Sequence, residues 1–264
     1  MYTAHTLTSP DRVHNRAEIV SPDETPAHRA LPLLLQLSDS ALPIGAFSHS
    51  FGLEAMAPRG LGEATAILET WLTGEWTGVD GPTFVLAHRA VGAGDLDRLH
   101  ELDRTLHAMR LPREWREAGS RMGRQMAKLA LVLAEEDDLL PGKGSDDVAP
   151  VSRNYWHEVA AGGSPGQHAV VAGSVFAALA FDEGEATTAY FSSTVQSLVG
   201  VMVRLLPLGQ LDGQRLIARL HAAAEPLVEQ ARSVRSTADL GSFLPFFEIA
   251  GMQHEVLRTR LFIS

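Results

Sequence analysis

The stretch LPREWREAGSRMGRQMAKLALVL, residues 111–133, decides the fold class of this sequence. Its apolar positions recur every three or four residues, which is the spacing of one face of an α-helix. They are Leu111, Trp115, Ala118, Met122, Met126, Leu129 and Leu133. Pro112 fits this prediction because proline is tolerated in the first turn of a helix. The stretch therefore predicts one long amphipathic helix.

Helical spacing extends over almost all of the chain. A second apolar stripe runs from Leu96 to Met109, and residues 186–206 are apolar nearly all round after Thr194, which places that helix in the middle of the protein. Arg204 in such a setting needs a carboxylate or carbonyl partner. No alternating run is long enough for a sheet. The sequence predicts an all-α, single-domain bundle of about nine to ten helices.

The composition narrows the function classes. The 264 residues carry a formal net charge of −10, which repels phosphate backbones and argues against nucleic acid as a partner. The absence of cysteine excludes disulfides and thiolate sites and fits a reducing cytoplasm. No apolar run reaches the roughly 18 residues of a membrane helix, and the first residues lack the apolar core of a secretory signal. We expect a cytoplasmic protein that binds neither membrane nor nucleic acid.

Breaks in periodicity divide the chain. Residues 1–28 are polar and contain three prolines, so we expect a disordered tail there. Residues 29–253 are predicted to form the helical domain, and residues 254–264 a tail that docks on a partner. The acidic run at 134–150 and AAGGSPG at 160–166 are predicted loops.

The stretch LQLSDSALPIGAFSHSFGLEAM, residues 35–56, gathers polar side chains among apolar ones. The Pro and Gly of its PIG turn end one helix, and Ser48 or Ser50 is expected to cap the next. Turns and caps leave His49 and Glu54 unexplained. Nothing nearby completes a catalytic triad with them, so we interpret the stretch as a surface that another protein holds.

Three near-matches to chemical motifs are incomplete. GGSPG around Ser164 has the spacing of a nucleophile elbow, but the elbow uses the N–H of the next residue, and Pro165 has none. PGKGS at 141–145 lacks the spacing of a P-loop, and Arg258 stands where a zinc-binding helix that begins at His254 needs a second histidine. We predict no catalytic residue, no tightly bound cofactor and no local metal ligand set, while a metal site assembled from distant segments or across a dimer stays open.

Basic side chains gather opposite the apolar stripe of residues 111–133. Within about 80° of one another on a helical wheel lie Arg110, Arg113, Arg121, Arg124 and Lys128. In a negatively charged chain this face is either solvated, with Glu114 and Glu117 beside it, or a docking face for an acidic partner.

The chain ends on HEVLRTRLFIS, residues 254–264, although termini are usually polar. Burial of Leu261, Phe262 and Ile263 would contribute on the order of 5 kcal/mol, enough to order a tail that finds a groove. The groove lies either in the same chain or in a partner, and the sequence leaves both open.

Three segments of the chain carry a family resemblance. They are LLQLSDSALPIGAFSHSFGLE, VMVRLLPLGQLDGQ and the closing HEVLRTRLFIS. In order and spacing they resemble the signature segments of the UreF family of urease accessory proteins, and the resemblance covers about residues 31–264. It implies an all-helical protein without enzymatic activity of its own.

The resemblance also implies partners. Proteins of this family form dimers, bind the accessory protein UreD (also called UreH) and with it recruit the nickel-carrying GTPase UreG to apo-urease. There, GTP hydrolysis is coupled to carbamylation of the active-site lysine and insertion of nickel, and UreF is thought to gate that hydrolysis. Nickel would be in transit along an internal route.

The candidate partner-binding residues combine positions that match the family with the polar groups left unexplained. They are Phe47, His49, Glu54, Gln210, Gln214, His254, Glu255, Arg258, Arg260, Leu261, Phe262 and Ser264, with Arg113, Arg121, Arg124 and Lys128 as the candidate face for an acidic partner. Arg260 matches an arginine in a tail that, in the family, becomes ordered on binding UreD. Phe47 stands where many members have tyrosine, so a hydrogen bond through that hydroxyl is lost. Gln210 and Gln214 are expected to shape the same face.

Two other functions stay open from the residues alone. One is a stand-alone nickel-binding metallochaperone. The other is a serine hydrolase with Ser164 as the nucleophile, for which the missing N–H of Pro165 is the main objection.

Overall fold

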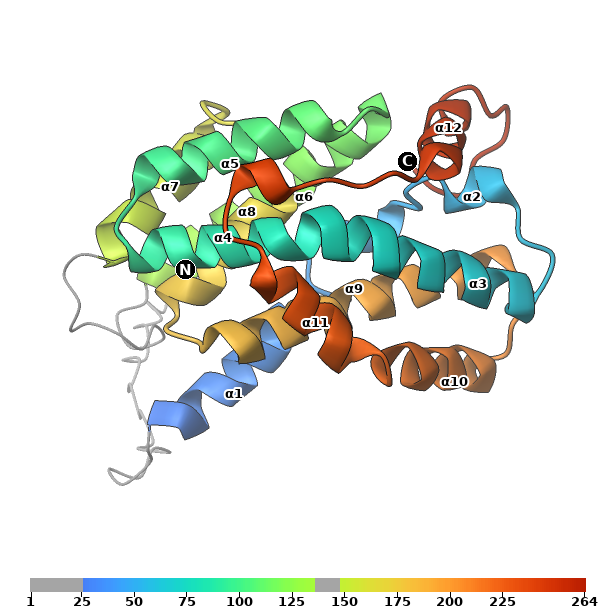
Figure 1. Cartoon of the computed structure of the whole chain (residues 1–264), viewed down its shortest axis with the longest axis horizontal. Coiled ribbons are helices and arrows are strands. Elements are labelled where there is room, and N and C mark those ends of the chain that lie inside the picture. Colours follow the sequence, from blue (N-terminus) through green and yellow to red (C-terminus); the bar gives the residue numbers. More distant parts are fainter. Residues whose placement is uncertain (1–25, 136–147) are drawn as a thin grey trace, which may run out of the picture.

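The computed structural model describes residues 26–135 and 148–264, and within these ranges the chain forms helices joined by turns, with no β-strand (Figure 1). The predicted all-α class is confirmed. Because every described element is helical, the core is built from apolar faces of helices packed against one another.

Twelve α-helices occur in the described ranges, more than the nine to ten predicted. They are α1 (Pro26–Leu37), α2 (Leu53–Met56), α3 (Leu61–Trp71), α4 (Gly81–Gly92), α5 (Leu96–Met109), α6 (Arg113–Glu135), α7 (Val148–Ala161), α8 (His168–Ala178), α9 (Glu183–Leu205), α10 (Gln210–His221), α11 (Ala224–Ser233) and α12 (Pro245–His254). A π-helical segment, η2 (Leu72–Asp80), joins α3 to α4, and the 3₁₀ turns are η1 (Ala46–Ser48) and η3 (Thr237–Asp239). The surplus arises because α2 is only a single turn and because residues 210–233 form two helices, α10 and α11, with Pro226 in the first turn of α11.

The centre of the molecule is formed by α4 and α8, which contact each other more extensively than any other pair of helices. All side chains from Ala169 to Ala177 are buried. The prediction that the helix at 186–206 lies in the middle is wrong in part, because α9 buries one side and leaves Gly200 and Arg204 exposed. The apolar run of α8, which lacks charged residues, was the better sign of a central helix.

Helices α5 and α6 match the two predicted apolar stripes, but Arg110 does not belong to the basic face. Its backbone is extended after the end of α5, and its guanidinium is buried between Glu75 and Asp80. The wheel prediction for Arg110 is wrong because it continued one helix through Pro112. Proline disfavours helical geometry in the residue before it, so α6 starts only at Arg113.

Two glycines bring α2 and α12 into backbone contact. A Cβ atom at Gly52 would lie 2.8 Å from the amide nitrogen of Gly251, and the φ angle of Gly52 is +81°, which side chains disfavour. Gly52 also precedes α2, which has no side-chain cap, so the prediction that Ser48 or Ser50 caps this helix is wrong. This crossing positions the end of α12 over α2.

Several sequence predictions concern the loops. The turn at 160–166 separates α7 from α8 as predicted. Of the predicted disordered tail, residues 1–25 lie outside the described residues, and residues 26–28 belong to α1. The P-loop-like sequence at 141–145 also lies outside them. No helix of the described part is long and apolar enough to cross a membrane.

Candidate functional site

After α12 the chain turns back and runs alongside the residues that precede α2 (Figure 1). The N–H of Ile263 donates to the carbonyl of Ser48 at 2.8 Å, and the N–H of Ser50 donates to the carbonyl oxygen of Ser264. The carboxyl-terminal residues 258–264, here called the tail, therefore lie in a groove of the same chain. We call it the tail groove, and its walls are residues 48–54, Glu114 on α6 and His254 on α12.

The side chains of the tail alternate between the groove and the outside. Phe262 and Ser264 are 4% and 3% exposed, whereas Leu261 and Ile263 are about half exposed at 53% and 54%. Such alternation is the pattern of an extended segment with one side buried. Burial of Phe262 contributes about 1.5–3 kcal/mol toward holding the tail.

Glu54, at the start of α2, binds the backbone of the tail. The N–H groups of Leu261 and Phe262 donate to its two carboxylate oxygens at 2.7 and 3.0 Å. Burial alone would raise the pKa of Glu54, but these N–H groups and His254 hold the pKa below its ordinary value. Glu54 is therefore an ionised carboxylate at neutral pH, and it recognises the main chain of the tail.

His254 lies fully buried between two carboxylates. Its Nε2 is 3.0 Å from Glu54 Oε2, and its Nδ1 is 2.7 Å from Glu114 Oε2. The other oxygen of Glu114 accepts a hydrogen bond from Arg260 of the tail at 2.8 Å. This chain of contacts links α2, α12, α6 and the tail, so the four segments form one polar network.

His49 closes the end of the groove. Its Nδ1 lies 2.7 Å from the hydroxyl oxygen of Ser264, and its side chain is buried. Burial, assisted by the positive charge of Arg121, lowers the pKa of His49 to about 4. His49 is therefore a neutral hydrogen-bonding partner of Ser264 at neutral pH.

Arg204 connects α9 to the tail. Its guanidinium carbon lies 4.1 Å from the centre of the Phe262 ring, and the guanidinium donates to the carbonyl of Phe47. The expected carbonyl partner is present, but Arg204 is exposed rather than buried, because α9 presents this side to the surface. The side chain of Phe47 is 60% exposed.

The outer side of α12 and the tail carries exposed apolar side chains. On α12 the buried positions Phe247, Ala250 and His254 face α2 and α6. The exposed positions, which we call the outer apolar face, are Phe243, Phe246, Ile249, Met252, Val256, Leu261 and Ile263. A concentration of this kind is unusual on a protein surface that contacts only water.

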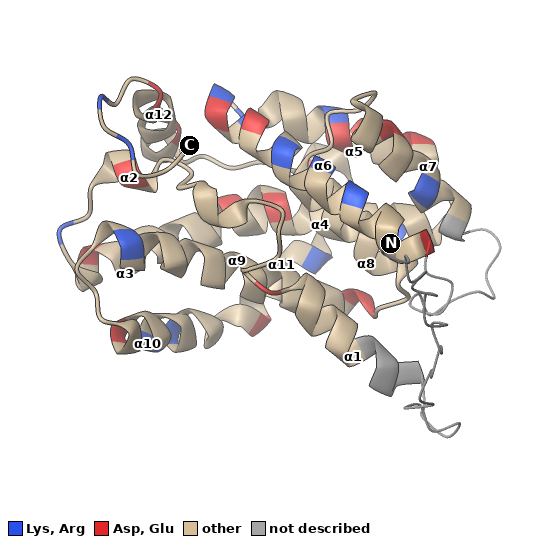
Figure 2. Ribbon diagram, turned by 180° about the vertical axis from the view of Figure 1, so that it is seen from behind, with Lys and Arg blue, Asp and Glu red and all other residues tan. Residues whose placement is uncertain are grey.

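The remaining predicted partner-binding residues are placed differently. Glu255 follows α12 and pairs with Arg113 at 3.1 Å, and Arg258 is exposed at the start of the tail. Gln210 and Gln214 are exposed on α10, which both overall views place on the far side of α3 from α12 (Figures 1 and 2). The structure therefore brings the amino-proximal loop and the tail together, but it does not bring the two glutamines to them.

Basic residues line the exposed side of α6 (Figure 2). Arg121 and Lys128 are exposed and Arg124 is partly buried, whereas Arg113 is held by Glu117 and Glu255 beside the tail groove. Arg121 also contacts Glu117, at 3.0 Å. We call the other three basic residues of this side, Arg121, Arg124 and Lys128, the basic face.

Ser164 is part of a turn that Asp103 organises. Its hydroxyl donates to the Asp103 carboxylate at 2.5 Å, and the N–H groups of Gly166 and Gln167 donate to the same carboxylate at 2.8 and 2.7 Å. The side chain of Asp103 thus satisfies backbone groups at the start of α8. In the described residues no three His, Asp or Glu side chains are arranged to hold a metal ion.

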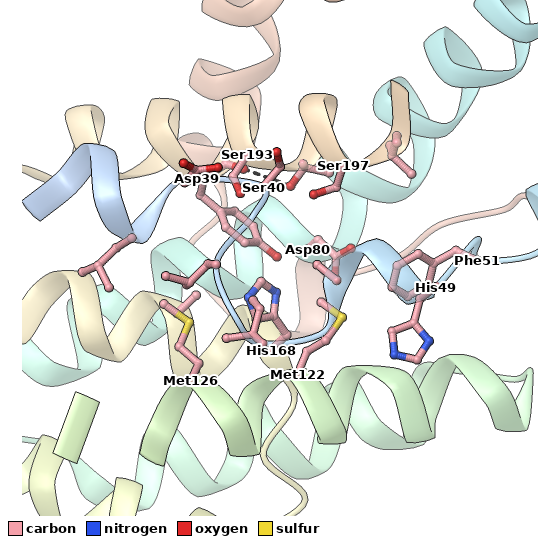
Figure 3. A pocket seen from close by; sticks show the side chains of 18 of the residues that line it. Asp39, Ser40, His49, Phe51, Asp80, Met122, Met126, His168, Ser193 and Ser197 are labelled. Atoms are coloured by element: carbon pink, nitrogen blue, oxygen red, sulfur yellow. Dashed lines mark hydrogen bonds between the residues drawn. The ribbon is translucent and has the colours of Figure 1, made fainter. Parts of the chain in front are cut away.

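A cavity of about 80 Å³ lies beside the tail groove, beneath residues 39–51. Figure 3 shows Asp39, Ser40, Ser193 and Ser197 along one side of it and His168, Met122 and Met126 along the other. A cavity of this size has room for several water molecules, and apolar groups form most of its lining. Burial lowers the pKa of His168 to about 4, so its imidazole is neutral at pH 7.

Asp80 forms part of the cavity wall together with Arg110. Burial raises the pKa of Asp80 to about 6 although Arg110 acts in the opposite direction, and the nearby Glu75 carboxylate adds to the rise. The triad of Glu75, Asp80 and Arg110 was missed by sequence reasoning. The two acidic residues lie five apart within the π-helical segment, and this spacing carries no recognised signal.

Sequence reasoning also missed Glu114 and Arg204 as groove residues. Glu114 was interpreted only as a neighbour of the basic residues on the same helix. The sequence did not show that Glu114 is buried. A buried carboxylate needs a specific partner, so its burial would have indicated a binding role. The unexplained pair His49 and Glu54 was the signal that did point to the groove.

These features define an all-helical protein that holds its own carboxyl end in a groove next to an exposed apolar helix face. The family model named UreF matches residues 61–221 of the chain. The chain belongs to the UreF family of urease accessory proteins. The matched range includes neither residues 48–54 of the tail groove nor the tail.

Curated relatives match over most of their length. The urease accessory protein UreF of Bacillus sp. (strain TB-90) is 33% identical over 238 residues, which cover 88% of this chain and 97% of the relative. That of Geobacillus kaustophilus (strain HTA426) is 35% identical over 242 residues, covering 88% and 96%. That of Corynebacterium efficiens is 34% identical over 234 residues, covering 87% and 95%.

Proposed function

We propose that this chain is a non-catalytic co-chaperone of urease maturation in the cytoplasm. With a UreD (UreH) protein it recruits the GTPase UreG to apo-urease and gates GTP-dependent insertion of nickel, acting as a homodimer. Membership of the UreF family supports the role in urease maturation. The observation that carries the proposed mechanism is the outer apolar face beside the self-docked tail.

The outer apolar face is the docking surface for UreD in this proposal. Phe243, Phe246 and Val256 are 90%, 79% and 79% exposed, so their apolar area is fully available to a partner. Aromatic side chains that become buried at an interface dominate binding free energy. The groove holds the backbone of the tail, and the side chains of Leu261 and Ile263 stay about half exposed for contact with a partner.

Charge on the outer apolar face is expected to abolish UreD binding. Phe246→Asp combined with Ile249→Asp places two carboxylates where the partner buries apolar surface, and we expect the affinity for the UreD protein of the same organism to fall at least a hundredfold. Neither side chain is buried in the free chain, so its thermal stability should change little. Isothermal titration or a quantitative pull-down measures the affinity, and circular dichroism measures the stability.

The matched control is Leu211→Asp. Leu211 is 73% exposed on α10 and lies away from α12. Equal loss of binding in the control and in the double variant, or unchanged binding in the double variant, would remove the outer apolar face from the UreD interface.

The basic face on α6 is the docking surface for an acidic region of UreG in this proposal. Arg121 and Lys128 are exposed and Arg124 is partly buried on one side of α6, in a chain whose net charge is −10, so they form a local positive region that can steer an acidic partner. Arg121 shares Glu117 with Arg113, whereas no ion pair of Arg124 or Lys128 occurs in the described residues.

Charge reversal tests this docking surface. We expect Arg121→Glu, Arg124→Glu and Lys128→Glu together to weaken UreG binding to the complex with UreD at least tenfold at low salt, and by less at 0.5 M salt because charges are screened. Biolayer interferometry at two salt concentrations measures both effects. The matched control is Arg59→Glu with Arg215→Glu, two exposed arginines on other elements. Unchanged affinity in the triple variant would leave the basic face as an ordinary solvated surface.

Nickel is cargo in this proposal rather than a resident cofactor. The cavity beside the tail groove supports an internal route, because it adjoins His49 and its lining includes carboxylate, imidazole, hydroxyl and thioether groups.

A further inference from the structure

A small pocket lies beside the outer apolar face, where α12 meets η2 and the residues that precede α6. Its volume is about 40 Å³, and polar groups form more of its lining than apolar groups do. Glu75 on η2 and Glu248 on α12 belong to the lining, so we call it the acidic pocket. Leu111, which also lines it, is 55% exposed, and Glu248 is only partly buried. A partner can therefore reach the pocket from the surface.

The acidic pocket has more negative than positive charge. Arg110 is the only cation of its lining, and its guanidinium already donates to Glu75 and to Asp80. Glu248 forms no ion pair within the described part of the chain. Three carboxylates against one guanidinium leave a negative charge without a partner, which is costly in a partly buried site.

The pKa of Glu248 agrees with this charge balance. Partial burial of its carboxyl raises the pKa, and the charge of Glu75 adds to the rise. The free chain therefore disfavours the ionised form of Glu248, because no cation compensates it there.

The acidic pocket also contains hydrogen-bonding atoms that lack partners. The hydroxyl oxygen of Ser242 is buried and has no hydrogen-bond partner among the described residues. Of the two carboxylate oxygens of Glu75, only Oε1 accepts a hydrogen bond from a described side chain, that of Arg110. Buried polar atoms are rarely left unpaired, so these atoms indicate that the pocket is completed by a donor from outside the chain.

A lysine side chain fits this set of groups. Its ammonium carries three N–H donors, and the free acceptors are Glu75, Glu248 and the hydroxyl of Ser242. The ammonium is compact and suits a pocket of about 40 Å³, whereas the guanidinium of arginine is a larger planar group. Lysine methylenes pack on apolar surface while the charge stays with polar groups. The apolar walls of the pocket are Val79, Met109, Leu111, Pro112 and Trp115.

We propose that the acidic pocket receives a lysine from the protein that binds the outer apolar face, and that Glu248 accepts a hydrogen bond from its ammonium. Phe243 and Phe246 of the outer apolar face lie between Ser242 and Glu248 in the chain, so a partner that covers them also covers the pocket. The inference rests on the proposed function, in which that partner is UreD. It adds a charged contact that selects the partner, as paired charges do at other interfaces.

Replacing Glu248 by glutamine tests the role of the carboxylate. The variant keeps the size of the side chain and removes its charge, so we expect the affinity for the UreD protein of the same organism to fall at least tenfold in isothermal titration. The thermal midpoint of the variant alone should not fall, because the folded chain disfavours the ionised Glu248. The matched control is Glu229→Gln on α11, where the side chain is 73% exposed, and it should bind UreD as the unmodified chain does.

A double-mutant cycle identifies the lysine. Each exposed lysine of the UreD protein is replaced by methionine, and its affinity is measured for the unmodified chain and for Glu248→Gln. One replacement should cost at least tenfold with the unmodified chain and much less with Glu248→Gln, because that variant has already lost the contact. If no lysine of UreD is coupled to Glu248 in this way, the proposal is overturned.

The outcomes separate this inference from the proposed function. Loss of UreD binding in Phe246→Asp with Ile249→Asp, together with unchanged binding in Glu248→Gln, would leave the outer apolar face as the UreD interface and overturn the lysine contact. A change in oligomeric state of Glu248→Gln with unchanged UreD binding would assign the pocket to a second copy of this chain and would overturn it too. If the unmodified chain does not bind UreD, both proposals are wrong.

Discussion

Replacing Arg110 by methionine lowers the free energy of unfolding by about 3–5 kcal/mol at pH 7.5, the expected cost of removing one partner from a buried ion-pair network. The guanidinium lies between Glu75 and Asp80, and all three side chains are nearly buried. Without it, two carboxylates of like charge face each other in a site that solvates neither. Urea-induced unfolding, followed by circular dichroism, measures the loss.

The loss from Arg110→Met should shrink in weak acid. In the intact chain burial already raises the pKa of Asp80 to about 6, and removal of the positive charge raises it further. A carboxyl whose pKa is raised by folding binds its proton more tightly in the folded state. Stability of the variant therefore increases as the pH falls from above 6 toward about 4, the ordinary value for Asp. At pH 5 we expect the difference from the unmodified chain to be clearly smaller than at pH 7.5.

The matched control for Arg110→Met is Arg215→Met. Arg215 pairs with Asp212 on the exposed side of α10, and its side chain is 76% exposed. Such a surface pair contributes at most about 0.5–1 kcal/mol. A cost below about 1 kcal/mol for Arg110→Met, or one equal to that of the control, would show that the buried triad is not a main source of stability.

Ending the chain at His254 removes the tail and should separate folding from partner binding. The deletion takes away Phe262, Arg260 and the outward side chains of Leu261 and Ile263, but no α-helix. We expect the far-ultraviolet circular dichroism to be nearly unchanged and the thermal midpoint to fall by several degrees, because the tail contributes a few kcal/mol. Binding to the UreD protein should weaken at least a hundredfold.

A milder variant separates the two parts of that effect. Phe262→Ala removes only the buried anchor, costing about 1.5–3 kcal/mol of the tail's contribution, and leaves Leu261 and Ile263 present. It should weaken UreD binding less than the deletion does. Loss of most of the helical signal on deletion would instead assign the tail to core stability.

The helices of this protein could be predicted from the periodicity of apolar residues. Which helices pack against one another could not be predicted in this way. The stripes of α5 and α6 are local patterns that packing preserves. The position of Arg110 depends on the residue at which α5 ends, and a helical wheel does not show where a helix ends. The central place of α8 could have been inferred from its uniform apolar composition, whereas α9, with Gln196 and Arg204, was misjudged because its apolar residues cluster on one side.

The tail groove could be anticipated only by what remained unexplained. His49 and Glu54 had no role in a turn or cap, and the apolar end of the chain had no place to go. Their contacts join residues more than 200 positions apart, so no local pattern encodes them. Glu114 and Arg204 complete the site, but in the sequence they resemble any surface charge on a helix.

Buried and exposed side chains alternate along residues 261–264. This alternation separates anchoring of the tail from contact with a partner, two roles that often share one surface. Inward, the groove recognises main-chain N–H groups and the two side chains of Phe262 and Ser264. The side chains of Leu261 and Ile263 point outward and do not contribute to binding of the tail in the groove. Natural variation at positions 261 and 263 can thus change which partner binds, while the contacts that hold the tail in its groove stay the same.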